Sequence, residues 1–206
     1  MNETNHILAK GFELFNQYGI RSVSMDDIAR ELGMSKKTIY QYFRDKNEFV
    51  DQVEQYRHNL RVHKFESIYA KNLSAIEELI EIHDMLQYFI MQYSKAFEFD
   101  LKKYYADLYN ERSEERRTTI QKAIKSNLQR GISEEVYRSD IDPQIISNYK
   151  SMFAIFMTEF ENSDVFKQDK SFYFREIFNL HILGILNEKG KKQYYKIIKE
   201  PIKAES

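Results

Sequence analysis

Residues 24–46 read SMDDIARELGMSKKTIYQYFRDK and predict two short helices joined by a tight turn. Ser24 can cap the first helix, and Asp27, three residues later, completes a capping-box pattern. Gly33 stands where this helix must stop, because glycine adopts the left-handed conformation without a steric penalty. Ser35 can then cap the second helix. The stretch therefore predicts a helix-turn-helix.

The second of these helices has two unlike faces. Ile39 and Phe43 lie one turn apart and are expected to point inward. The residues left largely on the outside are polar or basic: Lys36, Lys37, Thr38, Gln41 and Tyr42. A helix with such an outer face can enter the major groove of DNA and meet base edges there.

Residues 19–49 resemble the DNA-binding domain of the tetracycline-repressor (TetR) family of bacterial transcription regulators. The matching positions are Gly19 before the Ser/Thr-rich entry, Ile28-Ala29, Gly33-Met34-Ser35, Thr38-Ile39-Tyr40, Phe43, and Lys46 with Glu48. One position departs from the pattern, because many members carry a glycine where this chain has Lys37. We therefore expect Lys37 to reach a guanine edge or a phosphate.

The resemblance implies a mechanism as well as a fold. A homodimer would place two recognition helices in successive major grooves of a near-palindromic operator, with half-sites roughly 34 to 36 Å apart. Lys36 and Lys37 would meet base edges or adjacent phosphates, and hydroxyl groups would bind phosphates. The expected DNA-contacting residues are Ser24, Ser35, Lys36, Lys37, Thr38, Tyr40, Gln41, Tyr42 and Lys46. The protein would be a repressor that a small, largely apolar ligand releases from DNA.

The composition is that of an ordinary globular protein. The chain has 206 residues, a net charge of −1 and no cysteine, which excludes disulfides, thiolate metal sites and cysteine nucleophiles. Its beginning has no apolar signal region and no apolar run approaches a membrane span, so we expect a cytoplasmic protein. Positive charge is local, since residues 35–46 hold four basic residues against one acid.

Few helix breakers interrupt the chain, which has two prolines and six glycines, so we predict an almost wholly α-helical fold. We expect a DNA-binding domain at residues 1–46 and a ligand-binding and dimerisation domain at residues 47–206. Helices are expected at residues 3–18, from Asp45, from Ser74, at 100–109, at 113–130 with Gly131 closing it, from Asp142-Pro143, and at 171–187. The charged segment 187–206 can form one last short helix before Pro201.

The helices from Pro143 and at 171–187 carry too many apolar residues for one buried stripe. In TetR-like proteins the last two long helices of each subunit pair into a four-helix bundle. The resemblance therefore implies a dimer interface at Phe153, Phe156, Phe160, Phe174, Phe178, His181, Gly184 and Ile185. Gly184 suits a close helix crossing, because glycine inside a helix otherwise costs about 1 kcal/mol against alanine. The alternative is that both helices are simply core.

A ligand cavity is expected between the helices of the larger domain. Its candidate residues are His83, Phe89, Tyr93, Tyr149 and Phe153. The alternatives remain open, since a histidine on an apolar stripe can be a hydrogen-bonded core residue and aromatic stripes are first of all core.

No enzymatic motif emerges. The sequence has no GxGxxG, P-loop, GxSxG or HExxH, and its one Glu-x-x-His is Glu3 to His6 at the start of the first helix. We therefore expect no enzyme activity, no metal and no cofactor. Two other functions stay open: an all-α ligand-binding or protein-interaction module without DNA binding, and a helical-bundle enzyme. A gel shift would test the first, and a co-purifying metal or cofactor would indicate the second.

Overall fold

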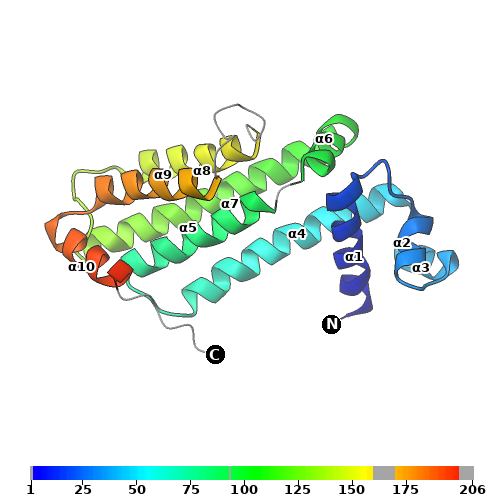
Figure 1. Ribbon diagram of the computed structural model, residues 1–206, viewed down its shortest axis with the longest axis horizontal. Helices are drawn as coiled ribbons and strands as arrows, with labels where there is room; N and C mark the ends of the chain where they lie inside the picture. The colour runs from blue at the N-terminus through cyan, green and yellow to red at the C-terminus, as the bar shows by residue number, and fades with distance from the viewer. Residues whose placement is uncertain (1, 93, 160–169, 200–206) are drawn as a thin grey trace. The chain divides into compact units, whose positions relative to one another are not determined.

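The computed structural model describes residues 2–92, 94–159 and 170–199, and these ranges contain ten α-helices and no β-strand (Figure 1). An isolated backbone bridge joins Tyr137 and Leu186. The prediction of an almost wholly α-helical fold is confirmed. The helices are α1 (Glu3–Tyr18), α2 (Met25–Glu31), α3 (Lys36–Tyr42), α4 (Lys46–Tyr69), α5 (Ala75–Met91), α6 (Lys95–Tyr104), α7 (Ala106–Ser133), α8 (Pro143–Glu159), α9 (Lys170–Ile185) and α10 (Glu188–Lys199).

The chain divides into two compact units. The first consists of Met1–His63 and Gln92–Arg116, and the second of Lys64–Met91 and Arg117–Ser206. The division falls inside α4 and α7, so each of these helices contributes to both units. The domain boundary expected after residue 46 remains a prediction.

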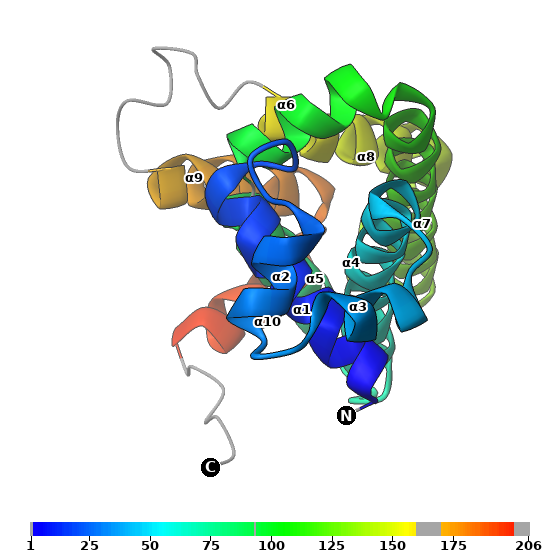
Figure 2. The ribbon, with the colours of Figure 1, turned by 90° about the vertical axis from the view of Figure 1, so that its right-hand side faces the viewer.

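An aromatic core supports the helix-turn-helix in the first unit. Phe15 of α1, Phe43 and Phe49 are fully buried, and the Phe43 and Phe49 rings meet edge to face with centroids 4.8 Å apart. Helix α1 packs against α2 and α6, and α2 packs against α3 (Figure 2). Because α2 and α3 send Ile28 and Ile39 into this core, their outer faces are held in a defined orientation.

Two predicted helix starts are confirmed. The Asp45 carboxylate accepts a hydrogen bond from the Glu48 backbone N–H at 2.9 Å, at the start of α4. The Asp142 carboxylate accepts one from the Gln144 N–H at 2.7 Å, just before Pro143 opens α8. In both places an acidic side chain satisfies a backbone donor that the first helical turn leaves free.

Several predicted helix boundaries are wrong. The chain breaks at Tyr105, between α6 and α7, so residues 100–109 are not one helix, and the helix expected to start at residue 113 starts at Ala106. Gly131 does not close α7, which continues to Ser133. A Cβ atom at Gly131 would lie 2.1 Å from the ring of Tyr137, so this glycine makes room for an aromatic ring from outside the helix. A tertiary contact of that kind leaves no local signal.

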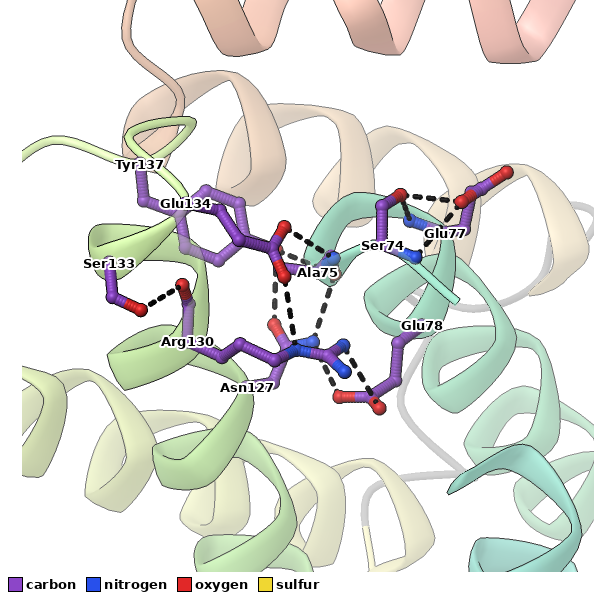
Figure 3. Close-up of polar contacts among 9 residues, drawn as sticks. All are labelled: Ser74, Ala75, Glu77, Glu78, Asn127, Arg130, Ser133, Glu134 and Tyr137. Carbon is purple, nitrogen blue, oxygen red and sulfur yellow. Dashed lines mark hydrogen bonds and ion pairs between the residues drawn. The ribbon is translucent and has the colours of Figure 1, made fainter. Parts of the chain in front are cut away.

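In the second unit a buried polar network fastens the start of α5 to the end of α7 (Figure 3). The Tyr137 hydroxyl lies 2.9 Å from the Ala75 carbonyl oxygen, and Asn127 Nδ2 donates to the same oxygen at 2.9 Å. Asn127 also donates to Glu78, whose carboxylate lies 3.0 Å from Arg130 Nη2. Burial raises the pKa of Tyr137, so its hydroxyl stays protonated. Helix α5 also packs against α8, α9 and α10.

Candidate nucleic-acid interface and ligand cavity

The turn between α2 and α3 has the geometry that the sequence predicts. Ser24 Oγ accepts a hydrogen bond from the Asp27 N–H at 3.1 Å, and the Asp27 carboxylate accepts one from the Ser24 N–H at 2.8 Å. The Ser24 hydroxyl also donates to the Asp27 carboxylate at 2.6 Å, and this bond, together with the one from the Ser24 N–H, lowers the pKa of Asp27 to about 2. Gly33 has a φ of +64°, and Ser35 Oγ accepts from the Thr38 N–H at 3.0 Å. The helix-turn-helix is thus confirmed, including both caps.

Helix α3 buries one side and exposes the other. Ile39 and Phe43, which caps the end of the helix, are fully buried. Lys36, Lys37 and Gln41 are exposed, and Tyr40 is 42% exposed. The outer face is therefore polar and basic, and a well-packed core holds it.

The nine predicted DNA-contacting residues differ in how far they are already engaged. Lys36 Nζ lies 2.8 Å from a carboxylate oxygen of Asp26, which raises the pKa of this lysine. Both partners are exposed, so the pair is weak and a phosphate can replace the carboxylate. Lys37 is exposed, and the described part of the structure gives its side chain no hydrogen bond or ion pair.

Two of the nine are held by other parts of the first unit. Lys46 Nζ donates to the Ile20 carbonyl oxygen at 2.7 Å, and burial lowers the pKa of this lysine. The Tyr42 hydroxyl donates to the Glu3 carboxylate at 2.6 Å, which raises the pKa of Tyr42. Sequence reasoning missed both bonds, because they join residues that are far apart in the chain.

A cavity of about 40 Å³ lies in the second unit, with walls from α5, α7, α8 and α9. Of the predicted ligand residues, His83 and Phe153 line it, while Phe89 and Tyr149 are not among its lining residues. Tyr93 lies outside the described residues. Ligand pockets usually measure roughly 300 to 1,000 Å³. A ligand of ordinary size therefore needs the wall side chains to move apart.

Two basic side chains, His83 and Lys150, line this cavity, and a third, His181, interacts electrostatically with both. The His83 ring stacks on Phe178 with centroids 4.0 Å apart. Burial, with a contribution from Lys150, lowers the pKa of His83 to about 4, and burial lowers the pKa of Lys150 to about 8. Burial, Lys150 and His83 together lower the pKa of His181 to about 3. Sequence reasoning missed Lys150, although a lysine three residues before Phe153 in an apolar helix is a usable signal.

The outer sides of α8 and α9 are apolar. Ile145 and Met152 of α8 are each 64% exposed and Leu180 of α9 is 78% exposed, with Tyr149 and Phe156 continuing the α8 stripe. Among the described residues outside its own stretch of α9, nothing lies within 4 Å of a Cβ atom placed at Gly184. We call these residues, Ile145, Tyr149, Met152, Phe156, Leu180 and Gly184, the outer apolar face.

The predicted dimer residues are divided between this face and the interior. Phe156 and Gly184 belong to the outer apolar face. Phe174, Phe178 and Ile185 are at most 7% exposed within their own unit, and Phe174 and Phe178, like Phe153, line the cavity. Helix periodicity indicated two apolar sides but could not decide which side faces inward. His181 is partly buried, and Phe160 lies outside the described residues.

Neither a metal site nor a membrane-spanning helix is found among the residues that the structure describes. Among them, no three His, Cys, Asp or Glu side chains come together in a way that could hold a metal ion. In the same ranges, no helix combines the length and the apolar character needed to cross a membrane.

Known proteins match both the sequence and the fold. Residues 7–53 match the family model described as bacterial regulatory proteins, tetR family. The HTH-type transcriptional regulator SAS2464 of Staphylococcus aureus (strain MSSA476) is 26% identical over 176 residues, covering 74% of this chain and 91% of the relative. A transcriptional regulator from Cytophaga hutchinsonii shares the fold with a TM-score of 0.67 at 15% identity, over 91% of this chain and 100% of that one. A gamma-butyrolactone receptor gives a TM-score of 0.64 at 14% identity, over 91% and 90%.

Proposed function

We propose that this chain, a member of the tetR family of bacterial regulatory proteins and a DNA-binding transcriptional regulator, is a dimeric repressor. A small ligand releases the repressor from its operator. The operator is near-palindromic, and the protein acts in the cytoplasm. Residues 1–46 bind DNA, and residues 47–206 bind the ligand and form the dimer. A regulator of this kind is not an enzyme.

The main support for DNA recognition is that α3 is amphipathic, with one buried apolar face and one exposed polar face. Ile39 and Phe43 hold the helix on an aromatic core, and among the described residues Lys37 has no hydrogen-bond or ion-pair partner that DNA would have to displace. Lys37 contacts a guanine edge or a phosphate, and Lys36 exchanges Asp26 for a phosphate. Ser24, Ser35, Thr38, Tyr40 and Gln41 supply further hydrogen bonds, while Tyr42 and Lys46 contribute chiefly by holding the helix in place.

The outer apolar face supports a dimer. Four of its side chains, Ile145, Tyr149, Met152 and Phe156, are exposed at helical spacing along α8, and an exposed apolar stripe of this kind is typical of a protein-protein interface. Two-fold pairing would let the face cover itself and would present two copies of α3. In this proposal the interface consists of Ile145, Tyr149, Met152, Phe156, Leu180 and Gly184, in place of the buried Phe174, Phe178 and Ile185.

The cavity in the second unit supports ligand control. A ligand that binds there must push the walls of a small cavity apart, and those walls include α8 and α9, whose outer sides form the dimer surface. Ligand binding therefore favours a dimer geometry with the wrong spacing for the operator. By linkage, the ligand weakens DNA binding by the same factor as DNA weakens ligand binding.

The test is a gel shift with the full-length protein and the DNA upstream of its own gene at moderate salt. We expect one specific complex, and a footprint with two protected segments about one helical turn apart. A scrambled duplex of equal length is the control, and it should bind more weakly and with the salt dependence of nonspecific contacts. A protein that ignores duplexes of every sequence would instead be an all-α ligand-binding or protein-interaction module.

A further inference from the structure

We propose that the cavity of the second unit takes the carboxylate of a small apolar acid, with Lys150 as its counter-ion and with His83 and His181 beside it. This inference rests on the proposed function, because it names the chemical class of the ligand that would occupy the same cavity. It goes further in one respect: the ligand must be an anion, and an uncharged apolar molecule of the same shape should bind much more weakly.

The first support is the gathering of basic groups from three helices. His83 comes from α5, Lys150 from α8 and His181 from α9. His83 and Lys150 line the cavity directly, and His181 interacts electrostatically with both. Apart from these groups and Gln87, the lining residues are apolar, including Ile124 from α7. The packing thus places positive charge and hydrogen-bond donors in a pocket that otherwise suits hydrocarbon.

The second support is the absence of an acidic partner within the described residues. Lys150 has no hydrogen bond or ion pair there, and burial alone accounts for the change in its pKa. The charged neighbours that act on His83 and His181 are Lys150 and, for His181, His83, all of them basic. A cation withdrawn from water without a counter-ion is costly. An anion entering the cavity would offset that cost, and a second cation would increase it.

The third support is an unsatisfied donor or acceptor. His181 Nε2 is buried and has no hydrogen-bond partner in the described structure. Buried polar atoms are nearly always paired, so an orphan next to a cavity indicates a place for a polar ligand atom. Since burial keeps both imidazoles neutral near neutral pH, each can donate one N–H to a carboxylate oxygen while Lys150 supplies the charge.

The apolar walls define the rest of the ligand. Phe153, Phe174 and Phe178 face the cavity together with aliphatic side chains of α5. The present volume of about 40 Å³ admits a carboxylate and a few carbon atoms. A longer chain or an aromatic ring must displace the aromatic walls, and these lie on the inner sides of α8 and α9. Binding of the acid is thereby coupled to the pair of helices that carries the outer apolar face.

The experiment compares acids with their uncharged analogues on the full-length protein in the absence of DNA. The probes are octanoate and phenylacetate, each with its primary amide, and binding is measured by calorimetry and by the shift in Tm. We expect each acid to bind at least tenfold more tightly than its amide. In Lys150→Met the acid should bind no better than the amide, and Lys150→Gln should behave alike. Lys122→Met removes an exposed charge from α7 and is the matched control, which should bind like the wild type.

The pH dependence gives an independent measurement. The acid should bind less tightly as the pH rises through about 8, where Lys150 loses its proton, while the affinity of the amide should not change. Equal binding of acid and amide, an unaltered acid affinity in both Lys150 variants, or no binding of either acid would each overturn the proposal. These results do not depend on DNA. If the protein gives no specific gel shift but prefers acids, the proposed repressor function is refuted and the anion site stands. If it binds its operator but does not bind acids, the anion site is refuted and the repressor function stands.

Discussion

Helices α3 and α8 distribute their polar and apolar residues in opposite ways. In α3 the lysines are outside and Ile39 is fully buried. In α8, Ile145 and Met152 are each 64% exposed, while Lys150 faces an internal cavity. Helix α9 repeats the second arrangement, with Leu180 exposed and His181 turned inward.

This contrast indicates what kind of partner each surface binds. A helix whose polar face is exposed to solvent needs no partner to be stable. The exposed face of α3 can therefore bind a polar surface such as DNA. A helix that shows water its apolar side gains free energy when that side is covered. Basic groups on the inner side of the same helices are likewise unfavourable, because they are buried without a counter-ion, and a bound anion would remove that cost. The second arrangement therefore indicates two missing partners, one outside and one inside.

The largest effect is expected from a charge on the outer apolar face. Leu180→Glu should leave the monomer folded, because this side chain is 78% exposed, but a two-fold dimer would then bury two glutamates. Each leucine buried at an interface is worth about 1.5 to 3 kcal/mol, so we expect dimerisation to weaken by about 3 kcal/mol or more. Sedimentation should show monomers, and operator binding should be lost. Ser126→Glu, on the exposed side of α7, is the control. A dimeric Leu180→Glu protein would place the interface elsewhere.

The next effect concerns the buried lysine. Burial lowers the pKa of Lys150 from its ordinary 10.5 to about 8, so the unfolded chain binds a proton that the folded protein holds less well. The resulting loss of folding stability is fully present below pH 8 and disappears as the pH rises to about 10.5. Lys150→Met should therefore raise the free energy of unfolding at neutral pH by about 1 to 3 kcal/mol, with little gain at pH 10.5. Urea unfolding at both pH values measures it. An unchanged stability in Lys150→Met at pH 7 would mean that the lysine is well solvated.

A comparable but more local effect is expected on α3. Lys37→Ala should cost about 1 to 3 kcal/mol of operator binding and relax the base preference if Lys37 reads a guanine. It should reduce the salt slope by about one unit, without a change in preference, if Lys37 meets a phosphate. Gel shifts across salt concentrations separate the two outcomes. Lys36→Ala is the comparison, and we expect a smaller loss because Lys36 already has Asp26 as a partner. If Lys37→Ala changes neither quantity, this lysine is outside the interface.

The smallest effect compares two glycines. Gly33 has a φ of +64°, and apart from its chain neighbours no described residue lies within 4 Å of an added Cβ atom, so Gly33→Ala should cost about 1 kcal/mol through backbone strain alone. Gly184 lies inside α9 with equally open surroundings, so Gly184→Ala should stabilise the monomer by up to about 1 kcal/mol. If Gly184 lies at the dimer interface, the same methyl group should weaken dimerisation. Unfolding and sedimentation of both variants measure these changes. The comparison would be contradicted if both substitutions changed the free energy of unfolding in the same direction.

Local patterns gave the helix-turn-helix almost completely. Ser24, Gly33 and Ser35 act within a few residues of their own positions, so their roles can be recognised without knowing the rest of the fold. The same holds for the caps at Asp45 and Asp142. The candidate DNA residues could be identified for the same reason, except that the bonds of Tyr42 to Glu3 and of Lys46 to Ile20 could not.

The larger unit was less predictable. Its helices were recognised, but Phe174 and Phe178 were assigned to the surface and Tyr149 to the cavity, and the structure places each on the opposite side. A helix with apolar residues all round gives no periodic signal for its inward direction. The contact between Gly131 and Tyr137 was equally hidden, because two residues six positions apart meet only after the chain turns back.

The amino-acid sequence was sufficient for the all-helical class, for the position of the turn and its caps, and for the basic outer face of α3, since each depends on interactions within one or two helical turns. Tertiary packing decided which sides of α8 and α9 are inside, that His83 and Lys150 line one cavity with His181 close enough to interact with both, and that Lys46 is held by the Ile20 carbonyl oxygen. These features depend on helices far apart in the chain, and only the folded protein brings them together.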